Sequence, residues 1–184
     1  MEYSFPHTIT NCIGEQLTFV RIENESDGDK LIVENSVVPG SGPIMHTHWL
    51  QDESLTVVHG KLGYEIQGQP YRYASEGETV TFTRGTPHRF WNAGESTLHC
   101  KGWVKPINTL PFFLTSIYAA QNKSGTAQPE TFDGAYLLTR YKSEYDLPLI
   151  PSFVKKVIMP ATVLVGRMMG KYKHFKDAPE PIRK

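Results

Sequence analysis

Four residues in two separate stretches of this sequence have side chains suited to binding a metal ion. His46, His48 and Glu53 lie in the stretch HTHWLQDE, and His88 lies in the later stretch RGTPHRFWN. Alternate residues of a β-strand point to the same side of the strand. A strand at HTH would therefore place the imidazole rings of His46 and His48 next to each other.

Glu53 has the wrong parity to share that face within one unbroken strand. A bend at WLQD would move Glu53 onto a following strand, from which its carboxylate can face the same interior. Gly85 and Pro87 predict a sharp turn, after which His88 opens a distant strand. Two imidazoles and a carboxylate from one hairpin, with a third imidazole from a distant strand, are what a metal site on a rolled sheet requires.

This ligand set determines what chemistry is possible. Three neutral histidines and one carboxylate leave a divalent cation with a residual charge of about +1, and in an octahedral arrangement two positions stay open for water, O2 or substrate. Mixed nitrogen and oxygen ligation suits Fe, Mn, Ni, Co, Cu or Zn, and the ligands alone do not choose among them. The plainer alternative is a pair of surface histidines on a strand.

The elements that must position these residues are mostly short strands. Segments rich in Val, Thr, Tyr and Phe alternate with Gly- and Pro-containing turns, and no long helical period interrupts them. This pattern predicts an all-β antiparallel sandwich or barrel and argues against a parallel α/β sheet. The expected strands cover residues 15–23, 29–38, 53–60, 61–69, 71–77, 78–84, the segment that His88 opens, and 97–104.

After Pro106 the pattern becomes helical. Asn108 or Thr109 can cap a first helix, and Gly125 can stop it. A second helix is expected to start from a cap at Thr131.

A third helical segment, residues 151–175, contains Pro160, which should kink or split it. Because the segment is apolar on more than one face between Val157 and Val165, we expect it to pack on the barrel or on a second subunit. Its lysines and arginines leave contact with a membrane surface as a less favoured alternative.

The charge distribution is uneven although the net charge is zero. Residues 1–104 carry 7 Lys and Arg against 13 Asp and Glu, whereas residues 151–184 carry 8 against 2. The acidic and basic parts could complement each other, or the basic part could contact an anionic partner. Nothing in this balance points to a nucleic-acid partner.

Several features indicate a cytoplasmic protein. The N-terminal residues show no basic and apolar leader pattern, and no run of eighteen apolar residues predicts a membrane span. Cys12 and Cys100 match no ligand or redox spacing, so we expect reduced thiols.

The two metal-binding stretches together resemble the cupins, small β-barrel proteins with two motifs of fixed spacing. The first motif, G-x5-H-x-H-x4-E-x6-G, is met at every position. The second, G-x5-P-x-G-x2-H-x3-N, is met except that Thr83 replaces the proline. The matching residues are Gly40, His46, His48, Glu53 and Gly60 in the first motif, and Gly77, Gly85, His88 and Asn92 in the second.

The resemblance covers roughly residues 30–105 and implies a jelly-roll barrel, to which we assign residues 1–105. The helical extension, residues 106–184, lies outside the resemblance and is expected to pack on the barrel or on a partner subunit. It implies one divalent transition metal per chain, held by His46, His48, Glu53 and His88. Gly40, Gly60, Gly77, Gly85 and Asn92 would be structural turn or strand-end residues. The replacement at Thr83 concerns the rigidity of a turn rather than the ligands.

The function implied is that of a small-molecule enzyme of the oxygenase or isomerase type, and a homodimer is expected. The alternative is a cupin module that binds a small molecule or a metal without turnover. Phe90, Phe82 and Tyr64 are the residues expected to line a substrate pocket. Phe90 has the parity of His88, which makes it the strongest of the three.

Overall fold

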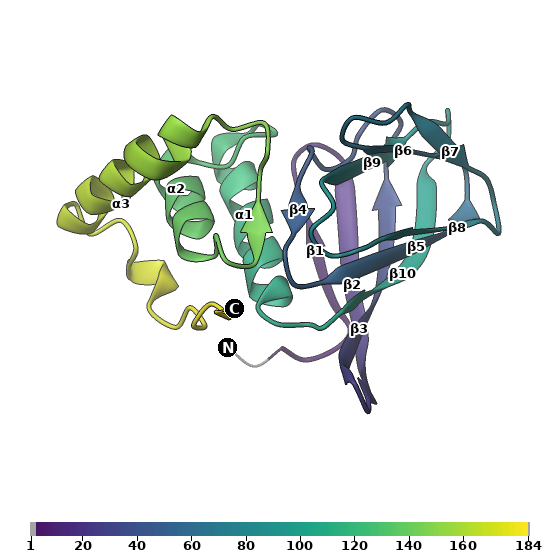
Figure 1. Cartoon of the computed structure of the whole chain (residues 1–184), viewed down its shortest axis with the longest axis horizontal. Helices are drawn as coiled ribbons and strands as arrows, with labels where there is room; N and C mark the ends of the chain where they lie inside the picture. The colour runs from purple at the N-terminus through teal and green to yellow at the C-terminus, as the bar shows by residue number, and fades with distance from the viewer. Residues whose placement is uncertain (1–2, 184) are drawn as a thin grey trace.

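The computed structural model describes residues 3–183 and places three β-sheets, one of them only two short strands, beside a group of helices (Figure 1). The strand pairings are antiparallel, as expected from the sequence. The strands are β1 His7–Thr10, β2 Glu15–Glu25, β3 Gly28–Val37, β4 Thr47–His48, β5 Asp52–His59, β6 Leu62–Ile66, β7 Arg72–Ala74, β8 Thr79–Phe82, β9 His88–Asn92, β10 Leu98–Lys105 and β11 Tyr145–Asp146.

The strands form sheets of different size rather than one continuous barrel wall. A six-stranded sheet has the order β1-β2-β3-β10-β5-β8, and a three-stranded sheet has the order β7-β6-β9. A short third ladder joins β11 to β4. The non-sequential order, in which β3 neighbours β10 and β10 neighbours β5, is typical of a jelly-roll.

One face of the six-stranded sheet is covered by two different layers. In β3, the buried residues Leu31, Val33, Asn35 and Val37 alternate with more exposed ones, so they share one face of the sheet. Leu31 and Val33 belong to a core that includes residues of the helices. Val37 belongs to a second core, shared with the three-stranded sheet. The two cores therefore meet along β3.

The helical region contains α1 Leu110–Ser124, α2 Thr131–Arg140, the π-helix η1 Val154–Ile158, α3 Met159–Met168 and the 3-10 helix η2 Lys173–Phe175. The first helix follows expectation, with Thr109 at its N-cap and Gly125 in the left-handed conformation at its C-cap. The expected cap at Thr131 is wrong by one residue. The N-cap is Glu130, whose carboxylate accepts a hydrogen bond from the Asp133 amide at 2.9 Å.

Pro160 does not split the last helical segment, since residues 152–168 are continuously helical, but the hydrogen-bond pattern changes beside it. It lies in the first turn of α3, and the π-helix η1 precedes it, where the Met159 amide donates to the Val154 carbonyl. A proline cannot donate the amide hydrogen bond of a regular helix, so the hydrogen-bond pattern changes at this point.

We expected the segment of residues 151–175 to be buried, but within one chain many of its apolar side chains are exposed. The segment packs on α2, on the side away from the sheets (Figure 1). Val163 and Gly166 are buried there, but Leu164 is 61% exposed and Met168 81% exposed. No helix within residues 3–183 combines the length and the apolar character needed to cross a bilayer.

Two short strands, β1 and β11, were not expected from the sequence, whereas β4 lies within the expected strand at HTH. The strand β11 follows α2, and it pairs Tyr145 with His48. The strand β4, which lies just before the bend that leads into β5, is thereby joined to the helical region. The expected bend itself is present, since it separates Thr47–His48 from Asp52–His59.

A fully buried carboxylate, Glu144, fixes this junction. Its Oε2 accepts hydrogen bonds from the Thr109 amide at 3.3 Å and the Gln51 side-chain amide at 3.5 Å. Its Oε1 accepts from the Ile182 amide at 2.9 Å. Glu144 thus connects the β4–β5 bend, the start of α1 and the C-terminal segment.

Replacing Glu144 with alanine should lower the free energy of unfolding by about 2–4 kcal/mol, because buried donors lose a charged acceptor. Urea denaturation monitored by circular dichroism measures this change. Glu34→Ala, at an exposed position of β3, is the matched control. A loss at Glu144 no larger than the loss at Glu34 would contradict the role assigned to this carboxylate.

Candidate metal centre

The two motif stretches come together through a direct backbone pairing. His46 and His88 form an antiparallel β-bridge in which each amide donates to the other residue's carbonyl at 2.9 Å. Their ring centroids are 4.5 Å apart. His48 follows on β4 and Glu53 lies near the start of β5, so the bend between them turns the carboxylate toward the three imidazoles.

The four side chains converge on one point. Glu53 Oε2 lies 3.4 Å from His88 Nε2, 3.6 Å from His48 Nε2 and 3.9 Å from His46 Nε2. One potential ligand atom from each residue lies within 4.8 Å of all the others. Atoms bound about 2.0–2.2 Å from one ion lie roughly 3–4 Å apart, so the distances from Glu53 to the three imidazoles fit a metal ion.

Backbone contacts orient two of the imidazoles for this purpose. His46 Nδ1 lies 2.8 Å from the Ile44 carbonyl, and His88 Nδ1 lies 2.8 Å from the Thr86 carbonyl. A carbonyl only accepts hydrogen bonds, so Nδ1 carries the proton in both rings. Each Nε2 therefore faces Glu53, and in a neutral ring its lone pair is available to a metal ion.

The electrostatics of the site also fit a cation. Burial raises the pKa of Glu53, but the imidazoles of His46, His88 and His48 outweigh this effect and hold the pKa well below its usual range. Burial is also the main cause that lowers the pKa of His48 to about 3. Near neutral pH the site therefore contains a carboxylate anion and a neutral His48.

Aromatic side chains hold the imidazoles in place. The ring of Phe82 stacks on His88, with centroids 4.1 Å apart and planes 7° apart. Tyr145 presents its edge to His48 at 5.5 Å. Tyr64 in turn contacts Phe82 edge-on at 6.0 Å. Two of the three residues expected at a substrate pocket therefore have a different position. Phe82 packs on a ligand imidazole and Tyr64 packs on Phe82.

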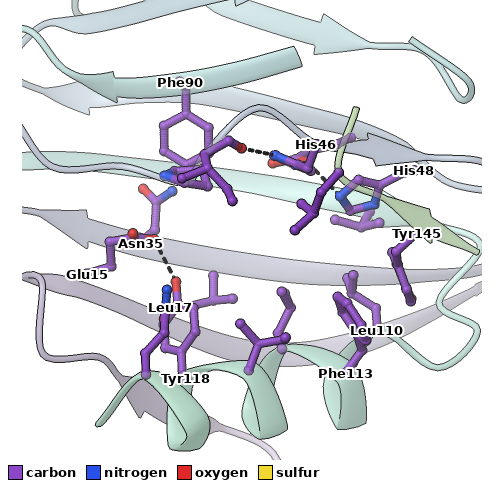
Figure 2. A pocket seen from close by; sticks show the side chains of 18 of the residues that line it. Glu15, Leu17, Asn35, His46, His48, Phe90, Leu110, Phe113, Tyr118 and Tyr145 are labelled. Carbon is purple, nitrogen blue, oxygen red and sulfur yellow. Dashed lines mark hydrogen bonds and ion pairs between the residues drawn. The ribbon is translucent and has the colours of Figure 1, made fainter. Parts of the chain in front are cut away.

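Phe90 is the one of the three that lines a cavity. This cavity has a volume of about 170 Å³ and lies where the six-stranded sheet, the three-stranded sheet and the helical region meet. Figure 2 shows His46 and His48 on one side of it and Phe90 on another. Most of the remaining wall is apolar, including Leu17, Val33, Leu110, Phe113, Ile117 and Leu138.

The expected turn glycines all adopt positive φ angles, at 78° for Gly40, 93° for Gly60, 84° for Gly77 and 79° for Gly85. Asn92 ends β9, and its amide donates to the carbonyls of Val37 and Ser96 at 2.8 Å. It therefore ties the end of its strand to two neighbouring segments.

Where the family motif has proline, the turn is closed by a side-chain contact instead. Thr83 Oγ1 lies 3.0 Å from Thr86 Oγ1, and the Thr86 amide donates to the Thr83 carbonyl. The turn that presents His88 is therefore restrained without proline.

Sequence reasoning missed the part of the cavity that comes from the helical extension. Leu110, Phe113 and Tyr118 of α1 and Tyr145 of β11 line it. The apolar residues of the first helix were a signal that it packs on something, but not that it closes the pocket of the metal cluster. Glu15 and Asn35 also line the cavity, and neither stands out in the sequence.

Comparisons with known proteins agree with the motif resemblance. Residues 34–104 match the family model described as "Cupin domain". The "Probable oxidoreductase virH" of Hypocrea virens is 32% identical over 68 residues, which are 36% of this chain and 31% of that protein. The chain thus spans about a third of the length of this curated relative.

Similar solved structures include KdgF from Halomonas sp., which is 21% identical, with 50% of this chain and 80% of that chain covered and a TM-score of 0.43. An uncharacterised double-stranded β-helix protein from Klebsiella pneumoniae is 19% identical, with 57% and 82% covered and a TM-score of 0.43.

The lowered pKa of His48, about 3 against an ordinary 6.5, should make the stability of the metal-free protein depend on pH. As pH falls from 6.5 toward 3, the unfolded chain takes up a proton that the folded chain does not, so the free energy of unfolding decreases. His48→Gln should weaken this dependence in urea denaturation at about pH 6.5 and about pH 5 after chelation. The exposed His59→Gln is the control, and equal pH dependence in both variants would contradict the prediction.

Proposed function

Residues 34–104 of this chain form a cupin domain, and we propose that the protein is an enzyme that binds one divalent transition metal and acts on a small organic molecule. The proposed ligands are His46, His48, Glu53 and His88. The observation that carries the proposal is the convergence of their four ligand atoms at the wall of a largely apolar cavity.

When bound, a divalent metal would supply Lewis acidity and open coordination positions beside the substrate. The chain itself would do the rest. Apolar walls such as Phe113 and Phe90 bind the body of the substrate and exclude water. The bonds from His46 and His88 to backbone carbonyls keep both rings aimed at the reacting end. The Glu53 carboxylate, which stays ionised, can accept a hydrogen bond from the substrate at that end.

Two reaction types remain from the sequence: oxygenation and isomerisation. The Hypocrea virens relative carries the description of a probable oxidoreductase, which favours oxidation chemistry for this chain. Oxygen uptake with a panel of small aromatic and aliphatic compounds, measured with iron-, manganese- and copper-loaded protein, tests this choice. Tight metal binding without turnover on any compound would instead favour a non-catalytic binding module.

The double variant His46→Ala, His88→Ala should lose the metal, because it removes two of the four proposed ligands, the two imidazoles that backbone carbonyls orient. We expect about one equivalent of metal per wild-type chain and less than about a tenth of that in the variant, by elemental analysis of both proteins.

The matched control is the double variant His59→Ala, His99→Ala, which removes two exposed histidines outside the cluster. It should keep the wild-type metal content. Equal metal content in the wild type and in the His46, His88 variant would refute the proposed site.

We further propose the domain limits expected from the sequence, with the cupin domain in residues 1–105 and the helical extension in residues 106–184. A cytoplasmic location and a homodimer are part of the same proposal. The exposed apolar residues of the last helical segment support a contact with a second copy of the chain. They are Phe153, Val157, Ile158, Leu164, Val165, Met168 and Met169.

Leu164→Glu combined with Met168→Glu should convert the dimer to a monomer, because charges would be placed in an apolar contact. Light scattering after size-exclusion chromatography measures the mass. Val58→Glu, at a residue of β5 that is 54% exposed, is the control and should leave the dimer intact. A monomeric wild type would contradict the dimer. If that monomer binds anionic vesicles, the exposed apolar residues of the last helical segment contact a membrane surface instead.

A further inference from the structure

The cavity beside the metal cluster has a second polar region that the proposed chemistry does not use. Asn35, Glu15 and Tyr118 line the cavity, and Figure 2 shows them on the side away from His48. Glu15 and Asn35 are 6% and 9% exposed, so both polar side chains are buried. They come from β2 and β3, whereas Tyr118 comes from α1.

Two polar groups of this region already form a hydrogen bond with each other. The Tyr118 hydroxyl donates to Glu15 Oε2 at 2.8 Å, which joins α1 to the edge of the cavity. Burial raises the pKa of Glu15 and holds that of Tyr118 well above its usual range. The Glu15–Tyr118 pair is therefore a fixed hydrogen bond across the junction of sheet and helix.

Asn35 is different, because its Oδ1 is buried and has no hydrogen-bond partner among the described residues. Its neighbours on the same strand face, Val33 and Val37, are apolar and belong to the two separate cores. A valine or leucine would suit such a position by packing alone. A buried acceptor without a donor is unfavourable and calls for a partner that the chain does not supply.

The size of the cavity limits what that partner can be. An apolar cavity of about 150 Å³ holds one benzene molecule, so the volume of about 170 Å³ here suits a ligand with a single ring. The apolar middle of the cavity fits the ring, and the metal cluster on one side fits an oxygen group. The ligand must also carry a hydrogen-bond donor, because Asn35 Oδ1 has no donor from the described residues.

We propose that Asn35, beside the Glu15–Tyr118 pair, is a specificity-determining residue that accepts a hydrogen bond from a hydroxyl group of a ring-sized, otherwise apolar ligand. The other end of this ligand carries an oxygen group that faces His46, His48, Glu53 and His88. This inference rests on the proposed function, since it assigns the substrate class of the same cavity.

The test compares benzoate with 4-hydroxybenzoate, which differ only by the hydroxyl group, on metal-loaded protein by calorimetry or NMR titration at millimolar concentration. Wild type should bind the hydroxylated compound about fivefold more tightly, which is the effect of one net hydrogen bond. Asn35→Leu keeps the approximate volume and should remove this preference while still binding benzoate. Asn24→Leu, at an exposed position of β2, is the matched control and should keep the preference.

Metal content and thermal stability of each variant are measured alongside. Asn35→Ala serves as a second variant in case leucine disturbs the fold. If wild type shows no preference, or if both folded Asn35 variants keep it, the subsite is overturned, and Asn35 contacts only a structural water. Normal metal content in that case leaves the metal site standing, whereas a wild type that binds no metal refutes the proposed function itself.

Discussion

The structure depends on how one face of the six-stranded sheet is covered. That face continues along β3 from Leu31 to Val37, and no single layer covers all of it. The three-stranded sheet covers one part and the helical region covers the other, so that each cover forms its own core. A cavity remains where the two covers meet, and the polar groups that could do chemistry lie around it. The position of the site is therefore a consequence of packing two unlike layers on one sheet.

The charges of Glu53 and the three histidines at that junction indicate what the cluster can bind. Burying an anion is costly unless a cation or several hydrogen-bond donors accompany it. Glu53 stays ionised, while His48, one of the groups facing it, stays neutral. The Nδ1 atoms of His46 and His88 lie against backbone carbonyls, so their Nε2 atoms and the carboxylate point at the same place. Three imidazole Nε2 atoms and a carboxylate directed at one point are an arrangement that a divalent cation satisfies.

The parts of the site that could be predicted from the sequence were those fixed by local geometry. Strand parity placed His46 beside His48, and the bend before Glu53 and the turn before His88 followed from recognisable residues. The antiparallel strands and the change of helical hydrogen bonding beside Pro160 followed from strand and helix signals in the same way. The pairing of Tyr145 with His48, and the contact of Tyr118 with Glu15, join residues 97 and 103 positions apart. Such contacts depend on how the helical region packs against the sheets. Strand parity and the spacing of motif residues in the sequence do not predict that packing.

The helical extension therefore has to be considered together with the metal cluster. A boundary near residue 105 separates two sequence patterns, but the cavity crosses it, because α1 supplies one wall and β11 extends the ladder of β4. The Glu144 carboxylate further ties the start of α1 to the bend that turns Glu53 toward the imidazoles. Without these contacts the apolar wall formed by Phe113 and its neighbours would be replaced by water, and Asn35 would face solvent. The sheets alone could still bring the four ligand side chains together, whereas the selection of what binds beside them requires the extension.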